Sequence, residues 1–432
     1  MDRRLYLLVG PGKSAIESRL NRLRRTVGAA ALLLAAGSAW AVSPGPSFYN
    51  LYDFNAEYAL DRLSNAWDPD DRADFRAVGT GLRVTGGSLN IRHLQVREDI
   101  KLRVPFGARW TARFRRERDL GLSGKEERSL LEIEHRLAGP WAVGVVGAPA
   151  FHKAEASLGF STAWRRREDR FVRASILWPG FDTNYAYKNT SVTEDHRRAY
   201  RTFPREGRVE AVWQSDRLWF GLDGRWARRW ELEHEDFAPG AEKYVETGER
   251  RALSMDASGR FGEWTGGGEW EYSRHAGSVV YDPARPGEDR SVSEESFRSI
   301  FHLEKHLSNA AIRLTAAPAV FRGRQTFAGS PGLNEFFVLR DRIVGVSYLP
   351  RFGSGWSGEA SYWLDSQSGR IRRGGSEDLR PRTQNRALVA LRWKKAPGNC
   401  FVVAANVEMD NDEAEKIFSF DGGVVQFQTV LP

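Results

Sequence analysis

The chain has very few of the residues that fix small exported folds or metal centres. Cys400 is the only cysteine among 432 residues. A single thiol forms neither an intramolecular disulfide nor a thiolate metal cluster, so the fold depends on hydrogen bonds and packing, or on a membrane. The sequence also lacks any stretch of 18 or more apolar residues, which excludes a transmembrane helix.

Motifs of catalysis and cofactor binding are equally scarce. The chain has eight histidines but no nucleophile elbow, paired-carboxylate motif, Walker loop or dinucleotide-binding spacing. His302, Glu304 and His306 would share one face of a strand, but side chains two residues apart lie about 6–7 Å from each other, too far for all three to hold one ion. We therefore expect no enzyme, no metal site and no cofactor.

What the chain does have begins with an export signal. Four arginines between residues 19 and 25 precede the apolar run 27–40, which ends in Ala39-Trp40-Ala41. A basic region, a short apolar region and an A-x-A site predict a signal peptide over residues 1–41; the alternative is a short N-terminal anchor helix. This segment carries seven basic and two acidic residues, so the formal net charge of +8 falls by five, to +3. A charge this small gives no support for nucleic acid as a partner.

Apolar and polar residues alternate along much of the remaining chain. In "KLRVPFGARWTARFR", residues 101–115, apolar side chains take every even position and Lys or Arg takes most of the odd ones. Similar runs cover residues 94–104, 131–137, 154–164, 218–230, 253–261, 264–272, 356–364 and 387–393. A period of two places successive side chains on opposite faces of a strand, and these runs approach the 9–11 residues with which a strand crosses a bilayer.

The connections between these runs alternate in length. Tight ones are predicted at Pro105–Ala108, Gly139-Pro140, Arg167–Asp169, Ser215-Asp216, Gly262-Glu263, Ser308-Asn309, Arg351–Gly355 and Ala396–Asn399. Longer polar ones are predicted at Arg118–Glu127, Gly180–Arg205, Glu231–Gly248, Gly277–Glu294, Gly323–Glu335, Ser366–Gln384 and Asp410–Lys416, with Ala148–His152 as a short exception. Eight tryptophans lie near strand ends, as in the aromatic girdles of a membrane barrel: Trp110, Trp141, Trp164, Trp178, Trp230, Trp264, Trp356 and Trp393.

On these patterns, residues 77–432 resemble a Gram-negative outer-membrane β-barrel of porin or exporter type. The resemblance implies an all-β, transmembrane, antiparallel up-and-down barrel of about 16–18 strands, with short periplasmic turns and long external loops. Residues 42–76 precede it as a periplasmic segment or a plug of the lumen. Gly422, Val425 and Phe427 fit the C-terminal assembly signal of such barrels, whereas Phe420 takes its polar position and "QTVLP" follows its aromatic residue.

In a barrel of this kind the charged face lines the lumen. The predicted lining residues are Lys101, Arg103, Arg109, Arg113, Arg115, Asp223, Arg225, Arg229, Asp256, Arg260, Glu269, Glu271, Glu359 and Arg392, and Arg165, Glu132 and Glu134 are expected on the same inward face. Two interpretations are open. A ring of cations draws anionic solutes through the pore, or Arg and Glu pair between strands and stiffen the wall. The small net charge favours pairing.

These patterns predict a channel in the cell outer membrane that passes small solutes or an exported polysaccharide through a charged, water-filled lumen. The expected partners are outer-membrane lipid and lipopolysaccharide, the barrel assembly machinery, and an anionic solute or polysaccharide. The alternatives are a non-conducting barrel that acts as an adhesin or a secretion or assembly scaffold, a hydrolase active at the barrel rim, and a soluble periplasmic β-protein.

Overall fold

A computed structural model describes residues 80–88, 94–121, 124–148, 157–167, 169–178, 196–202, 204–236, 243–281, 289–373, 375–396, 399–409 and 419–430. The expected signal peptide and the segment 42–76 lie outside these residues. The strands are β1 (Gly81–Ser88), β2 (Leu94–Phe106), β3 (Trp110–Gly121), β4 (Gly124–Arg136), β5 (Trp141–Ala148), β6 (Ser157–Arg167), β7 (Arg170–Trp178), β8 (His196–Thr202), β9 (Glu206–Gln214), β10 (Leu218–Asp236), β11 (Lys243–Phe261), β12 (Trp264–Tyr281), β13 (Arg290–His306), β14 (Ala310–Phe327), β15 (Glu335–Gly353), β16 (Trp356–Arg373), β17 (Ser376–Ala396), β18 (Asn399–Glu408) and β19 (Ser419–Val430).

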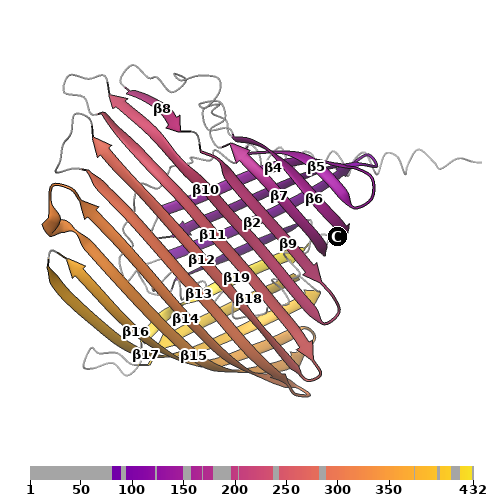
Figure 1. Ribbon diagram of the computed structural model, residues 1–432. Helices are drawn as coiled ribbons and strands as arrows, with labels where there is room; N and C mark the ends of the chain where they lie inside the picture. Colours follow the sequence, from indigo (N-terminus) through magenta and orange to yellow (C-terminus); the bar gives the residue numbers. More distant parts are fainter. Residues whose placement is uncertain are drawn as a thin grey trace, which may run out of the picture. The chain divides into compact units, whose positions relative to one another are not determined.

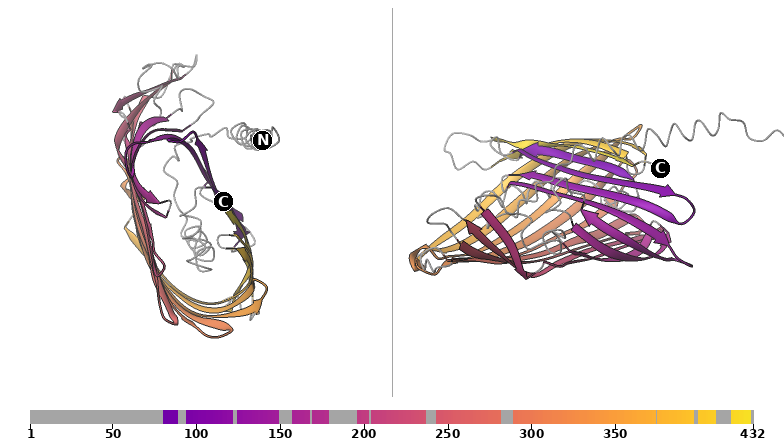
Figure 2. Two further views of the ribbon diagram at one scale, coloured as in Figure 1. Left: turned by 90° about the vertical axis from the view of Figure 1, so that its right-hand side faces the viewer. Right: turned by 90° about the horizontal axis from the view of Figure 1, so that it is seen from above.

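These strands form one closed antiparallel barrel (Figures 1 and 2). Sequential strands pair along the wall, and β1 pairs with both β2 and β19, which closes the ring. The strands β8 and β9 share one edge of β10: β9 pairs with residues 219–227 and β8 with residues 231–236. The 19 strands therefore fill 18 positions in the wall, within the range that the alternation predicts.

The connections differ from the expected ones at one end of the barrel. Tight turns close what we call the turn end, for example at residues 107–109, 262–263 and 307–309. At the opposite end, the loop end, β10 to β17 continue as strands of 17–21 residues. Most residues expected in the long loops 231–248, 277–294, 323–335 and 366–384 are therefore strand, and β8 lies within the expected loop 180–205. Apolar alternation ends where the outward side chains become polar, but the hydrogen-bond ladder continues.

The outer surface of the wall carries a band of exposed apolar side chains. Phe160, Leu314 and Val389 are 57%, 55% and 64% exposed, and each lies on the outward face of its strand. Soluble monomers do not expose contiguous apolar areas of this extent, whereas a membrane barrel covers such a band with lipid. Among the described residues no helix is both long and apolar enough to cross a membrane.

Seven of the eight expected girdle tryptophans lie on the outward face, and five are 37% exposed or more: Trp110, Trp141, Trp264, Trp356 and Trp393. Trp230 departs from the pattern. A β-bulge between Ala227 and Trp230 shifts the register of β10 against β11. One extra residue exchanges the two faces of a strand, so Trp230 turns inward and packs over Gly248.

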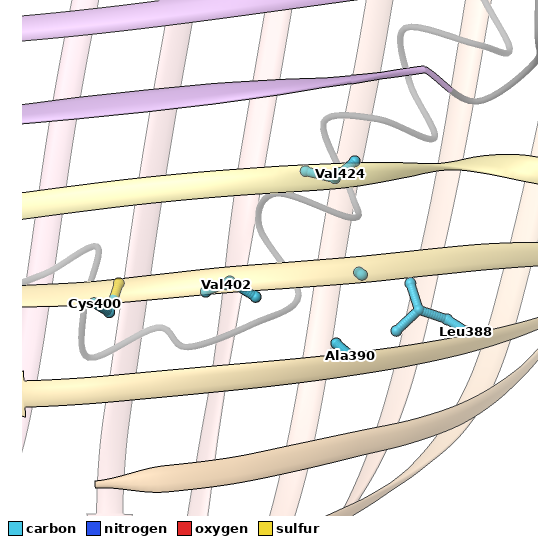
Figure 3. Close-up of a cluster of buried hydrophobic side chains, with 6 residues drawn as sticks. Leu388, Ala390, Cys400, Val402 and Val424 are labelled. Carbon is cyan, nitrogen blue, oxygen red and sulfur yellow. The ribbon is translucent and has the colours of Figure 1, made fainter.

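One sector of the inner face is apolar. Leu388, Ala390, Cys400, Val402, Ala404 and Val424 form a buried cluster on β17, β18 and β19 (Figure 3). Leu388, Val402 and Val424 are each 1% exposed, and Trp363 packs against the cluster from β16. The only cysteine of the chain is thus a buried thiol that forms no disulfide and lies within an apolar surface.

Candidate lumen constriction

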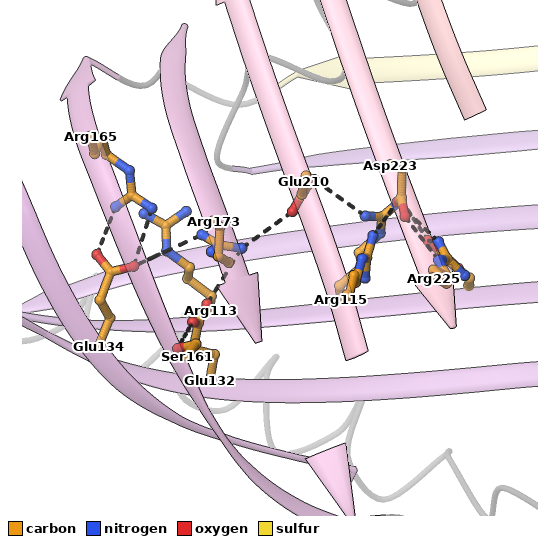
Figure 4. A network of polar contacts seen from close by, with 12 residues as sticks. Arg113, Arg115, Glu132, Glu134, Ser161, Arg165, Arg173, Glu210, Asp223 and Arg225 are labelled. Atoms are coloured by element: carbon orange, nitrogen blue, oxygen red, sulfur yellow. Dashed lines mark hydrogen bonds and ion pairs between the residues drawn. The ribbon is translucent and has the colours of Figure 1, made fainter. Parts of the chain in front are cut away.

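Charged side chains from seven strands meet inside the barrel, between β2 and β10, and we call this set the ion bridge (Figure 4). It consists of Arg113, Arg115, Arg165, Arg173, Arg208 and Arg225 with Asp99, Glu117, Glu132, Glu134, Glu210 and Asp223. Alternation places all of them on the inner face, because apolar neighbours such as Phe114, Ile133 and Val209 point outward. The outward apolar pattern thereby fixes which charges enter the lumen.

Glu134 on β4 is the centre of the first half of the bridge. The guanidinium of Arg165 donates two hydrogen bonds to its carboxylate, at 2.7 and 3.1 Å. Arg113 lies 3.5 Å away and Arg173 3.9 Å away. Bidentate arginine–carboxylate contacts are among the strongest polar contacts in proteins and also fix orientation. Glu134 is 5% exposed, so the carboxylate at the centre of this half is buried beneath its arginine partners.

Two residues continue the bridge toward β9. Arg173 lies 3.4 Å from Glu132 and 3.5 Å from Glu210. The hydroxyl of Ser161 donates a hydrogen bond to Glu132. Glu210 in turn lies 3.6 Å from Arg115 on β3. A chain of contacts therefore leads from β4 through β7 and β9 back to β3.

The second half of the bridge joins β3 to β10. Arg225 donates hydrogen bonds of 3.3 Å to both carboxylate oxygens of Glu117. It also contacts Asp223 on its own strand, which accepts a further hydrogen bond from Arg208. Arg115 contacts Glu117 as well. These ion pairs connect β3, β9 and β10. The contact between Arg115 and Asp99 adds β2 to them.

These contacts cross the lumen. Five strands separate β3 from β10 along the wall. At a spacing of about 4.8 Å between strands, the path along the wall is about 29 Å. The Arg225–Glu117 contact of 3.3 Å must therefore pass through the interior. The ion bridge narrows this sector of the barrel.

Small residues on β5 and β6 make room for this approach. Ala142 and Ala163 are each 3% exposed on the inner face. A Cβ atom on Gly144 would lie 2.7 Å from the Ser161 hydroxyl and 3.0 Å from the Ile133 carbonyl oxygen. Distances this short leave no space for a side chain, so the glycine is required where the bridge packs against the wall.

The ion bridge is electrically balanced, with six arginines facing six carboxylates. The contacts are those of the pairing interpretation, in which Arg and Glu of different strands neutralise each other. Ion pairs of intermediate burial contribute modestly to stability, but removing one partner leaves an uncompensated charge and costs more. Substitution of a single member of the ion bridge is therefore expected to destabilise the barrel more than removal of both partners of a pair.

The predicted lining residues are found in several places. Seven residues expected on the inward face belong to the ion bridge: Arg113, Arg115, Glu132, Glu134, Arg165, Asp223 and Arg225. Others lie elsewhere on the inner face: Lys101, Arg103, Asp256, Arg260, Glu269, Glu271, Glu359 and Arg392. Two do not line the lumen wall. Arg109 lies in the turn 107–109, because Gly107 with φ 77° begins a tight reversal there, and Arg229 falls in the bulge of β10 with its side chain 65% exposed.

The residues predicted to line the lumen do not include five members of the ion bridge: Asp99, Glu117, Arg173, Arg208 and Glu210. Arg208 and Glu210 lie in "EGRVEAVWQ", a strand of nine residues whose outward Val209, Ala211 and Trp213 give the only signal. Sequence alternation assigns a residue to the inner face, but it does not tell which distant strand lies opposite.

Two of the described histidines, His234 and His306, contact polar side chains of neighbouring strands. His234, near the loop end, is 1% exposed; it lies 3.2 Å from the Glu246 carboxylate and stacks on Tyr244 at 4.4 Å. His306 contacts Thr265, and Glu304 accepts two hydrogen bonds from Arg313. Within the described ranges no group of three or more metal-ligating side chains occurs.

No protein-family model matches the chain, and no curated protein matches it. Solved structures that are similar include outer-membrane proteins. OmpT of Vibrio cholerae shares 11% identity over 81% of this chain and 94% of its own, at a TM-score of 0.31. OccK2 (OpdF) of Pseudomonas aeruginosa shares 10% identity over 81% and 96%, at 0.35. CdiB from Acinetobacter baumannii shares 10% over 81% and 60%, at 0.35. The barrel itself is established by the strand pairing of this chain.

Proposed function

We propose that the chain is an outer-membrane channel that passes small solutes or an exported polysaccharide through a charged lumen, with the ion bridge as its constriction. The observation that carries this proposal is the pairing of an outward apolar band with an inward charged face. Lipid covers the first surface, and water accompanies the second. In this arrangement the turn end faces the periplasm and the loop end faces the exterior.

The chemistry of the bridge favours solutes that exchange hydrogen bonds. Guanidinium groups donate and carboxylates accept, and the two alternate along the bridge. A hydroxyl-rich solute finds both kinds of partner at each step, whereas a simple ion meets no net charge in the bridge. The constriction therefore selects by size and by hydrogen bonding more than by the sign of charge.

The same bridge also favours a second function. Because ion pairs join β3 to β10 through the interior, this sector offers little free cross-section. A barrel that is closed in this way serves as a scaffold or adhesin that presents its long hairpins at the loop end. The two functions differ in one measurable property, the conductance of the folded barrel.

The experiment is a planar-bilayer recording of the refolded chain from residue 42 onward. We expect stable conductance steps, and a larger step when the cross-lumen pair is removed in the double variant Arg225→Gln, Glu117→Gln. The matched control is Arg370→Gln, Glu377→Gln, which removes an ion pair of 2.9 Å on the outer surface. If both the native barrel and the double variant are silent while circular dichroism shows folded β-structure, the channel proposal fails and the scaffold takes its place.

A further inference from the structure

A second group of arginines lies on the outer face of the barrel, far from the ion bridge. We call it the external arginine patch: Arg322 and Arg324 on β14, Arg340 and Arg342 on β15, and Arg370 and Arg372 on β16. All six occupy even positions, as do the outward Leu314 and Val344 of the same strands. The register between these strands is continuous across the patch, so the six side chains share one surface.

The patch begins where the apolar band ends. Along β15 from the turn end, the outward residues are Tyr348, Val346 and Val344, and then Arg342 and Arg340. From Gly353 to Arg342 the strand covers about 36 Å, which at a tilt of about 40° is about 28 Å along the barrel axis. The apolar band of such barrels is about 25 Å tall. Arg342 therefore lies at the height of the lipid headgroups.

The charges in the patch are crowded. Arg322 and Arg370 both lie opposite Val338, and Arg340 is two residues from Val338 on the same face. Diagonal neighbours on a sheet are about 7–8 Å apart, and like charges in such positions repel. Arg324 also packs against the ring of Phe336, with its guanidinium carbon 4.9 Å from the centroid.

The carboxylates that the structure describes compensate only part of the patch. Glu377 lies 2.9 Å from Arg370 and 3.6 Å from Arg372. Arg322, Arg340 and Arg342 are exposed and form no hydrogen bond or ion pair with any residue that the structure describes. The N–H donors of these three guanidinium groups are therefore available to an acceptor outside the barrel at this height.

We propose that Arg322, Arg340 and Arg342 bind the phosphate groups of lipopolysaccharide in the external leaflet, an inference that rests on the proposed placement in an outer membrane. Guanidinium forks pair with phosphate oxygens through two parallel hydrogen bonds, and arginine is preferred for this contact. The patch faces away from the lumen, so a permeating solute does not reach it. Its height, its sign and its crowding all match an anionic headgroup beside the wall.

The test uses purified lipid A as the probe, titrated into the refolded barrel in detergent and followed by native mass spectrometry. Each lost arginine–phosphate contact is expected to weaken binding by about tenfold. The variant Arg322→Gln, Arg340→Gln, Arg342→Gln loses three such contacts and should therefore bind lipid A on the order of a thousandfold more weakly. The matched control is Arg166→Gln, Arg167→Gln, Arg217→Gln, three exposed arginines at the turn end, and should bind like the native chain.

Several outcomes overturn the proposal. Equal affinity of the native chain and the patch variant shows that the patch does not bind the lipid. Equal binding of dephosphorylated lipid A shows that acyl chains alone are recognised. Displacement by inorganic phosphate at a concentration as low as that of lipid A shows a site for a free anion instead. Undiminished binding by the variant Arg322→Lys, Arg340→Lys, Arg342→Lys shows that positive charge alone is recognised and overturns the bidentate contact. The folding of each variant is checked by its migration on unheated gels. The patch variant should leave the channel conductance unchanged, because the patch lies outside the lumen. Failure of the lipid A test is therefore distinguishable from failure of the channel proposal.

Discussion

The balance of charges in the ion bridge leads to a prediction about ion selectivity. Two triple variants change the bridge in opposite directions. The first removes three arginines: Arg115→Gln, Arg208→Gln, Arg225→Gln. The second removes the three carboxylates beside them: Glu117→Gln, Glu210→Gln, Asp223→Asn. The first leaves the bridge with three uncompensated negative charges and the second with three positive ones, while the overall size of the side chains is nearly unchanged.

The expected magnitude follows from Coulomb's law. A monovalent ion that passes about 7 Å from one uncompensated charge in water interacts with it by about 0.6 kcal/mol. Three such charges amount to about 1.8 kcal/mol, or about a twentyfold change in the partition of that ion into the constriction. The first variant should therefore become cation-selective and the second anion-selective, relative to the native barrel. Lower effective dielectric near the wall increases the effect.

The assay is the reversal potential of a single barrel in a planar bilayer under a tenfold salt gradient, near 0.1 M. The sextuple variant that combines both sets restores a neutral bridge without its ion pairs, and its reversal potential should return to the native value. This control separates charge from simple loosening of the wall. At 1 M salt the Debye length falls to about 3 Å, so the difference between the two triple variants should collapse.

The reasoning is refuted if the two triple variants shift the reversal potential in the same direction, or if neither shifts it at low salt. In both cases the permeating ions do not pass the ion bridge, and the path of conduction lies elsewhere in the lumen. Loss of conductance in the sextuple variant would further show that the pairs hold the pore open instead of narrowing it.

Three more predictions concern stability and access. Gly144→Ala should destabilise the barrel by about 1–3 kcal/mol in urea unfolding, because its Cβ meets backbone at 3.0 Å, whereas Gly332→Ala, with open space, should be neutral. Burial raises the pKa of Glu294, beyond the apolar band at the loop end of β13, to about 7. Its contribution to folding is thus present below about pH 4.5 and lost as pH rises through 7, so Glu294→Gln should flatten the fall of the thermal midpoint between pH 5 and 8; an unchanged slope contradicts this. Cys400, 3% exposed, should react slowly with a polar maleimide in the folded barrel and quickly in urea; fast labelling of the folded barrel contradicts its burial.

Much of the fold is predictable from the sequence because lipid constrains one face of every strand. In residues 101–115 the even apolar positions and the Pro-Phe-Gly break predict two strands and a turn, and β2 ends at Phe106 while β3 begins at Trp110. The tryptophans near the tight turns point outward for the same reason. Because lipid surrounds the whole barrel, every strand needs an apolar residue at every second position. This repetition is visible in a single sequence.

The rest depends on contacts that no local pattern contains. Trp230 turns inward because one extra residue in a bulge exchanges the faces of β10, and "RWARRW" shows no sign of it. The hairpins at the loop end continue as strands where apolar and polar residues no longer alternate regularly, so the sequence pattern ends before the hydrogen-bond ladder does. Glu117 meets Arg225 only because five intervening strands curve around, a distance of 108 residues along the chain.

This division has a physical consequence for how such a barrel changes over time. The outward face tolerates exchange among apolar residues, because lipid adapts its shape and each position contributes independently. The ion bridge behaves differently, since a single substitution leaves a partner charge uncompensated in a partly buried site. Its members can change only together, or by removal of both partners of a pair. Selectivity is therefore expected to change in paired steps within the bridge, whereas single exposed arginines, such as those of the external patch, can be gained or lost one at a time without cost to the fold.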